Sequence, residues 1–250
     1  MLDSQRNLEN AAGTATYYDH LWPTLGTKLH YTEINRVRFL VEGIREFAGC
    51  AGLKILDIGC GRGWMAPFLS PLGSVTGVDF SPAGIQFARE NYGEHASFLL
   101  ADAASPTLGL PAGVRFDVVV CSEVIEHVPE HLSLLRQVAG FLRPDGWFML
   151  TTPNGNVWPQ FGRDPRYLTQ LQPVENWVTT RQLVALFRQA GFLIVRHEGR
   201  PVYEFRIGFT GWLQRRRVEM LSRRLGLYHL WGRLILPTAL YQVVAAQKTP

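Results

Sequence analysis

The sequence predicts an α/β protein built around a buried, mostly parallel sheet. Short β-rich apolar runs alternate with stretches of helical spacing along most of the 250 residues. This alternation is typical of repeated strand–helix–strand units with right-handed crossovers. The runs are mostly continuous instead of alternating with polar residues, as expected for strands that are buried on both faces. An apolar fraction of 46% is sufficient for a sizeable core.

Each element can be placed from its own signals. Strands are expected at Lys54–Ile58, Ser74–Asp79, Ala96–Leu100, Phe116–Cys121, Trp147–Thr152, Phe192–His197 and Leu240–Lys248. Helices are expected at Tyr31–Phe47, Gly63–Leu69, Pro82–Asn91, Glu130–Phe141 and Thr180–Ala190. Ser81-Pro82 provides a helix cap followed by proline at the first helical position. Because no internal repeat interrupts this order, we predict a single domain.

Within this domain, residues 1–50 are expected to form a helical lid, 51–198 and 238–250 the core, and 199–237 a basic amphipathic insert. The segment 205–233 carries seven arginines and one acid, a charge of +6, which leaves −2 for the rest of a chain whose net charge is +4. Such a local basic stretch argues against a nucleic-acid partner. The insert could cap an acceptor pocket, form a homodimer contact or rest on an anionic bilayer, and we rank the first two ahead of the third.

The three cysteines form no CxxC pair, so neither a zinc ribbon nor a disulfide framework is indicated. The N-terminus lacks the basic and apolar pattern of a secretory signal, and no run reaches the roughly 20 apolar residues of a membrane-spanning helix. These observations predict a cytoplasmic protein.

The first expected strand runs into a glycine-rich turn, DIGCGRG at residues 57–63. Glycines at this turn let the backbone approach a ligand closely, and the following helix would offer free N–H groups. The residues also satisfy the looser GxGxxG/A form of a nicotinamide fingerprint. The turn alone is therefore compatible with a nicotinamide dinucleotide, with another nucleoside-containing ligand, or with an ordinary tight turn that binds nothing.

Three aspartates at strand ends separate these alternatives. Asp57 lies two residues before the first glycine, where a carboxylate can take the ammonium of an amino-acid-bearing ligand. Asp79 closes the second strand and could accept both hydroxyls of a ribose. Asp102 follows the third strand and could accept from an adenine amino group, with Phe80 against the ring face. All three lie where open α/β sheets bind ligands.

Four motifs, DIGCGRG, VTGVDFSPAGIQFARE, FDVVVCSEVIEHVP and LRPDGWFMLTTPN, resemble in this order the motifs of class I S-adenosylmethionine-dependent methyltransferases. Within this class, the motifs resemble those of the ubiquinone-biosynthesis O-methyltransferases. The resemblance implies a Rossmann-like three-layer sandwich whose sheet has the strand order 3-2-1-4-5-7-6, with the last strand antiparallel. It implies S-adenosylmethionine as cofactor and Arg38, from the family's HxINPLR pattern, as the partner of the methionine carboxylate. The expected cofactor-binding residues are Arg38, Asp57, Gly59, Cys60, Gly61, Asp79, Phe80, Asp102, Ala103 and Ser122.

Glu123, Glu126 and His127 stand at i, i+3 and i+4, so a helix after the fourth strand would place all three on one face. Such a set suits a divalent cation such as Mg, Mn or Zn. The resembling ubiquinone enzymes and small-RNA 2′-O-methyltransferases use such a triplet to bind metal, whereas other relatives carry similar residues without metal. Both roles stay open: a metal site, or catalysis by His127 as general base together with Glu126.

The sequence thus predicts an enzyme that methylates a small-molecule acceptor, preferably a phenol, sugar or quinone-precursor hydroxyl. N-methylation of a small amine is the near alternative, because the cofactor motifs are silent about the acceptor atom. RNA 2′-O-methylation is a weaker alternative, because it would require a basic face around the site. A cofactor-binding regulator without turnover is a further alternative from a different functional class. An N-terminal aromatic cover is expected to complete the acceptor pocket, with Tyr17, Tyr18, His20, Trp22, His30 and Tyr31.

Overall fold

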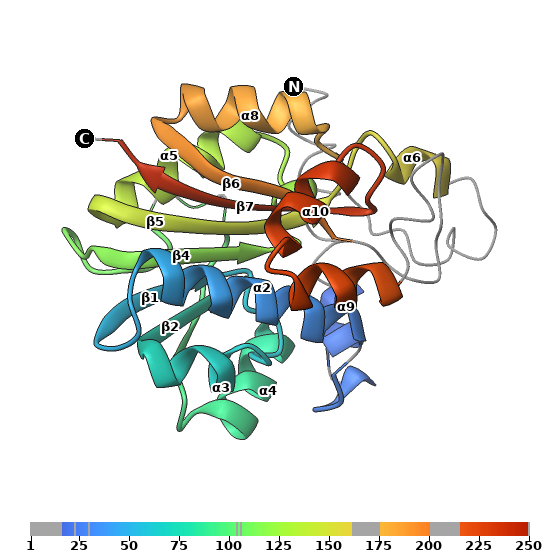
Figure 1. Ribbon diagram of the computed structural model, residues 1–250. Helices are drawn as coiled ribbons and strands as arrows, with labels where there is room; N and C mark the ends of the chain where they lie inside the picture. Colours follow the sequence, from blue (N-terminus) through green and yellow to red (C-terminus); the bar gives the residue numbers. More distant parts are fainter. Residues whose placement is uncertain are drawn as a thin grey trace.

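The structure, a computed structural model, describes residues 17–22, 24–29, 31–103, 105, 107–161, 176–200 and 216–249. Within these ranges seven strands form one sheet in the order β3-β2-β1-β4-β5-β7-β6 (Figure 1). β7 runs antiparallel to both of its neighbours, and the other neighbouring pairs are parallel. The predicted fold class, strand order and antiparallel last strand are confirmed.

Every predicted strand is present. The strands are β1 (Leu53–Ile58), β2 (Gly73–Asp79), β3 (Ser97–Leu100), β4 (Phe116–Ser122), β5 (Leu142–Pro153), β6 (Phe192–Arg200) and β7 (Tyr241–Lys248). The largest difference is in β5, which begins at Leu142 and not at Trp147, because Leu142 pairs with Phe116 before a shift in register. β1, β4 and β7 each contain four or five consecutive buried residues, in agreement with their continuous apolar runs.

Eight α-helices and two short 3-10 helices have bounds within the described ranges. They are α2 (Tyr31–Phe47), α3 (Ala66–Leu69), η1 (Ser70–Leu72), α4 (Pro82–Tyr92), η2 (Ile125–His127), α5 (His131–Phe141), α6 (Trp158–Phe161), α8 (Thr180–Gln189), α9 (Arg216–Arg224) and α10 (Tyr228–Ile235). The predicted cap is confirmed, since the Ser81 hydroxyl accepts a hydrogen bond of 3.0 Å from the backbone N–H of Gly84. α3 begins later than predicted because Gly63 has a φ of 77°, which helical residues do not adopt. No helix in the described ranges has the length and apolarity needed to cross a membrane.

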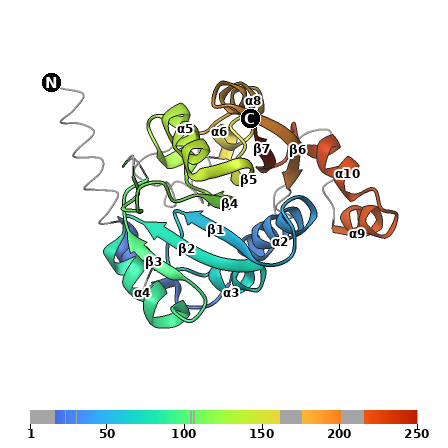
Figure 2. The ribbon, with the colours of Figure 1, turned by 90° about the vertical axis from the view of Figure 1, so that its left-hand side faces the viewer.

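Helices cover both faces of the sheet and produce the three-layer arrangement (Figure 2). α5 and α8 pack on one face against side chains such as Leu56 and Val119. α2 and α3 pack on the other face against Ile55 and Val118. Consecutive residues of β1 and β4 therefore enter opposite cores, as the two-residue period of a strand requires.

The carboxyl ends of the parallel strands meet at one edge of the sheet, which positions the functional site. The chain leaves β1 towards β2 on one side, whereas β4 lies on its other side. Open α/β sheets bind ligands in the crevice at such a reversal of strand order. β6 ends and β7 begins at the same edge, so the predicted insert 199–237 is attached there. Its residues 201–215, residues 1–16 of the predicted lid and His30 lie outside the described residues.

Candidate active site

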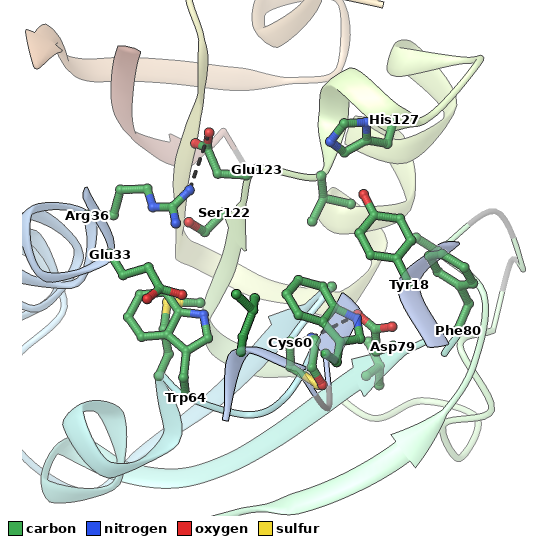
Figure 3. A pocket seen from close by; sticks show the side chains of 18 of the residues that line it. Tyr18, Glu33, Arg36, Cys60, Trp64, Asp79, Phe80, Ser122, Glu123 and His127 are labelled. Carbon is green, nitrogen blue, oxygen red and sulfur yellow. Dashed lines mark hydrogen bonds and ion pairs between the residues drawn. The ribbon is translucent and has the colours of Figure 1, made fainter. Parts of the chain in front are cut away.

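A cavity of about 260 Å³ lies at the carboxyl edge of the sheet (Figure 3). Its walls come from the turn after β1, the ends of β2 and β4, the loop after β3, and five residues of the N-terminal part: Tyr18, Trp22, Leu25, Glu33 and Arg36. The predicted cofactor residues that line it are Gly59, Cys60, Gly61, Asp79, Phe80, Ala103 and Ser122. Glu123 and His127 also line the cavity, whereas the predicted residues that do not are Arg38, Asp57, Asp102 and Glu126.

The turn after β1 tolerates only glycine at two of its positions. Gly59 and Gly61 have φ angles of 72° and 52°, which side chains with a Cβ rarely adopt. A Cβ on Gly59 would also come within 2.2 Å of the Val124 side chain, and one on Gly61 within 2.9 Å of the Trp22 ring. The absence of a Cβ therefore lets the turn pass close to both the loop after β4 and the N-terminal segment.

Asp79 fixes this turn from the end of β2. One carboxylate oxygen accepts a hydrogen bond of 2.8 Å from the backbone N–H of Gly61, and the other accepts one of 2.9 Å from Ser81. Burial raises the pKa of Asp79 to about 6, although the backbone donors lower it. The carboxylate lies in the cavity wall with unused lone pairs, and it can therefore still accept from hydroxyl groups of a ligand.

Asp57 and Asp102 occupy different environments from Asp79. Asp57 is buried, and its Oδ1 atom has no hydrogen-bond partner. Burial, with a smaller repulsion from Asp79, raises the pKa of Asp57 to about 8. Its carboxyl is therefore mostly protonated at neutral pH, and a cation placed nearby would favour the ionised form. Asp102 is exposed, next to the cavity-lining Ala103.

The arginine that reaches the cavity is Arg36 and not the predicted Arg38. Arg36 lines the cavity, its Nη1 atom lies 3.4 Å from a carboxylate oxygen of Glu123, and its buried Nε atom has no hydrogen-bond partner (Figure 3). Arg38 is half-exposed and donates to Glu42 over 2.8 Å. On α2 the residues at positions 33, 36, 37 and 40 share the inward side, and position 38 is rotated away from it. The helical period of α2, and not the match to the family's HxINPLR pattern, therefore determines which arginine reaches the cavity.

The predicted common face of Glu123, Glu126 and His127 does not form, and this expectation was wrong. The helix after β4 is the short η2, and Glu123 lies before it with a φ of 59°. The Glu123 carboxylate turns towards Arg36 and accepts a hydrogen bond of 2.9 Å from Thr151. Burial raises the pKa of Glu123, which Arg36 partly counteracts. A residue with left-handed backbone cannot continue a helical face.

Glu126 and His127 remain neighbours. Glu126 is buried and accepts a hydrogen bond of 2.9 Å from Thr152, and its other oxygen lies 3.7 Å from Nε2 of His127. Within the described ranges, no three His, Cys, Asp or Glu side chains are grouped closely enough to hold a metal ion together. Because Glu123 faces the Arg36 guanidinium instead, the predicted metal triplet is not assembled.

Aromatic side chains from the N-terminal segment cover the cavity. Tyr18 stacks on Trp22 with ring centroids 5.3 Å apart and meets Phe80 edge-on at 5.4 Å. Its ring also lies 6.3 Å from the His127 ring. Of the predicted cover, Tyr18 and Trp22 line the cavity, whereas His20 is exposed. A wall of this composition excludes water and suits a flat or apolar group.

Sequence reasoning missed the residues that hold this cover in place. The fully buried Arg62 donates to both carboxylate oxygens of Glu33, at 2.9 and 3.1 Å, and to the carbonyls of Gly26 and Lys28. Asp19 accepts a hydrogen bond of 2.6 Å from the Ser81 hydroxyl, at the start of α4. Arg62 lies inside the DIGCGRG motif, but its partners are about 30 residues away in sequence, so spacing could not reveal them.

A seven-stranded sheet of this order, with a glycine turn after β1 and an acid at the end of β2 facing one cavity, defines a class I S-adenosylmethionine-dependent methyltransferase. The chain belongs to the methyltransferase domain family, whose model matches residues 31–197. Its cofactor is S-adenosylmethionine, and the predicted class and cofactor are confirmed.

Curated relatives are ubiquinone biosynthesis O-methyltransferases. The protein from Bordetella avium is 32% identical over 171 residues, which cover 63% of this chain and 69% of the relative. The protein from Pseudomonas aeruginosa (strain LESB58) is 34% identical over 172 residues, 64% of this chain and 72% of the relative. Magnesium protoporphyrin IX methyltransferase from Synechocystis PCC 6803, solved with bound S-adenosylhomocysteine, shares the fold at 15% identity, with a TM-score of 0.63 over 98% of this chain and 100% of that chain.

The residues around the cavity fit S-adenosylmethionine. The unpartnered Nε of Arg36 offers a donor for a carboxylate, and the unpartnered Oδ1 of Asp57 offers an acceptor for an ammonium group. Gly59 and Gly61 line the cavity, so the backbone of this turn can lie against a ligand. An ammonium and a carboxylate are the charged groups of the amino-acid part of S-adenosylmethionine. Arg36 lies on one side of the cavity, and Asp79 and Phe80 lie on the other (Figure 3).

Proposed function

We propose that this protein transfers the methyl group of S-adenosylmethionine to a hydroxyl group of a small phenolic acceptor of the quinone-precursor type, with His127 as general base. The observation that carries the proposal is the position of His127 in the cavity wall, in contact with the Tyr18 ring. The names of the relatives, which are O-methyltransferases of ubiquinone biosynthesis, support a ring hydroxyl as acceptor.

In this proposal Arg36 binds the methionine carboxylate and Asp57 the ammonium group. The backbone of residues 59–61 lies against the cofactor, and Asp79 accepts from the ribose hydroxyls. Phe80 and Ala103 enclose the adenine, and the exposed Asp102 accepts from its amino group. Ser122, whose hydroxyl lies 2.8 Å from that of Thr151, completes the wall at the end of β4.

S-adenosylmethionine, when bound, supplies an electrophilic methyl carbon on a sulfonium. His127 accepts the proton of the acceptor hydroxyl as the new oxygen–carbon bond forms and the carbon–sulfur bond breaks. The Glu126 carboxylate, 3.7 Å from Nε2 of His127, orients the ring and stabilises its positive charge. Tyr18 and Phe80 exclude water, so that the acceptor oxygen is the nucleophile held nearest to the methyl group.

A direct assay follows from the acceptor assignment. With methyl-labelled S-adenosylmethionine we expect label on the oxygen of a catechol-type acceptor, at a rate about tenfold or more above that of the matched aromatic amine, because a base in the wall assists an acceptor that must lose a proton. Mass spectrometry of the product locates the label. Label on nitrogen alone would contradict O-methylation, and cofactor binding without any transfer to either acceptor would contradict an enzymatic role.

Replacing Arg36 by glutamine should weaken S-adenosylhomocysteine binding by about 10- to 100-fold, because a hydrogen bond to a charged group contributes about 1.5–3 kcal/mol. The matched variant Arg38→Gln removes a half-exposed ion pair on the same helix and should change the dissociation constant by less than about twofold. Calorimetry of both variants measures the difference. A larger loss in Arg38→Gln would restore the assignment made from the sequence pattern.

A further inference from the structure

α9 and α10 carry a surface that the cavity does not use. Six aliphatic side chains of residues 220–234 are between 48% and 60% exposed: Met220, Leu221, Leu225, Leu227, Leu230 and Leu234. The exposed arginines 217, 224 and 233 lie among them. We call these nine residues the α9–α10 surface. Exposed aliphatic side chains gathered in this number mark an interaction site.

Helical spacing places eight members of this surface on the outer sides of the two helices, and Leu227 lies between the helices. On α9 and its end, residues 217, 220, 221, 224 and 225 recur at intervals of three or four, and on α10 residues 230, 233 and 234 do the same. The opposite side of α10 is buried through Tyr228, Trp231 and Ile235, which pack together. The exposed stripes therefore point away from the packed side of the helices.

The charge of the α9–α10 surface has one sign. Every exposed residue in 217–234 is an arginine, an aliphatic residue or glycine. The single acid of that range, Glu219, is only 13% exposed and bonds to Arg223 at 3.1 Å. Glu42 of the neighbouring α2 lies 2.8 Å from Arg38 and 3.6 Å from Arg223. Among the described residues, the surface thus combines aliphatic side chains with arginines that have no acidic partner.

The place of the surface in the fold relates it to the cavity. α9 and α10 lie between the end of β6 and the start of β7, which belong to the carboxyl edge of the sheet. Figures 1 and 2 show both helices beside α2, whose first turns supply Glu33 and Arg36 to the cavity. The α9–α10 surface and the cavity therefore belong to neighbouring parts of the molecule.

We propose that the α9–α10 surface docks on an anionic lipid bilayer, with the aliphatic side chains inserted between headgroups and the arginines on lipid phosphates. Short helices with aliphatic and arginine side chains on one side lie in the interface of a membrane and do not cross it. A second copy of this chain fits less well, because a symmetric contact would bring the arginines of both copies into one interface in which the surface supplies no exposed acid. A nucleic acid would leave the aliphatic side chains without a partner.

The test uses the full chain and co-flotation with vesicles of phosphatidylcholine alone or mixed with phosphatidylglycerol. We expect binding to the mixed vesicles, weaker at high salt, and little binding to phosphatidylcholine. The triple variant Arg217→Gln, Arg224→Gln, Arg233→Gln should bind on the order of 100-fold more weakly, since each arginine near an anionic surface contributes about fivefold. The double variant Leu225→Ser, Leu230→Ser should also lose binding at unchanged charge.

Matched controls lie on other faces of the molecule. The triple variant Arg136→Gln, Arg181→Gln, Arg188→Gln removes the same charge from α5 and α8, and Val184→Ser with Leu193→Ser removes exposed aliphatic side chains elsewhere. Both should bind vesicles like the unchanged protein. Equal losses in control and surface variants, or no binding to mixed vesicles, would overturn the proposal. A dimer that becomes a monomer in the surface variants, without vesicle binding, would also overturn it and identify a second copy as the occupant.

Discussion

Replacing His127 by alanine is expected to lower kcat by about 100- to 10,000-fold while the affinity for S-adenosylmethionine changes by less than about threefold. The reason is its position: His127 lines the cavity beside Tyr18, on the side away from Arg36, and its ring nitrogen has the acceptor capacity that proton removal requires (Figure 3). Steady-state kinetics and calorimetry on the same preparation measure the two quantities separately.

Two further variants separate catalysis from packing. His127→Asn keeps a polar side chain but no base, and it should lose as much activity as alanine. His131→Ala removes the next histidine in sequence, which does not line the cavity, and it should leave kcat within about twofold. Equal losses of turnover and of cofactor affinity in His127→Ala would exclude the role of general base, because a base contributes only to the chemical step.

The second large effect is expected for Arg62→Met, which should destabilise the protein by about 3–5 kcal/mol. The fully buried guanidinium holds both oxygens of Glu33 and two backbone carbonyls, at Gly26 and Lys28. Methionine keeps the length of the side chain, but it removes the guanidinium from a buried carboxylate and from two backbone carbonyls. Urea denaturation measures the loss, and cofactor affinity should fall with it because Glu33 lies in the cavity wall.

The exposed ion pair of Arg38 and Glu42 provides the comparison for this variant. Arg38→Met should cost less than about 1 kcal/mol, since half-exposed pairs are screened by solvent. The double variant Arg62→Met, Glu33→Leu should recover part of the stability lost in Arg62→Met, because it removes the buried carboxylate that has lost its guanidinium partner. An Arg62→Met protein as stable as Arg38→Met would show that the cover is not anchored through this arginine.

The residues at the carboxyl edge of the sheet illustrate what spacing in the sequence can and cannot predict. The glycine turn and Asp79 were placed correctly because strand ends fix where these residues lie, whichever helices surround them. The common face predicted for Glu123, Glu126 and His127 was wrong. Their spacing brings them together only on a continuous helix, and Glu123 has a left-handed backbone conformation. Arg38 matched a family pattern, but the rotation of α2 brought Arg36 to the cavity instead.

The sequence by itself determined the sheet, its strand order through family resemblance, and the polar groups at the strand ends, because continuous apolar runs and glycine turns are local properties. Only the tertiary structure decided which arginine reaches the cavity and which acids face one another. It also revealed the buried pair of Arg62 and Glu33 and the outward stripes of α9 and α10. These features depend on the directions of side chains and on contacts between segments far apart in the sequence. Tertiary packing determines both, and the local sequence pattern does not.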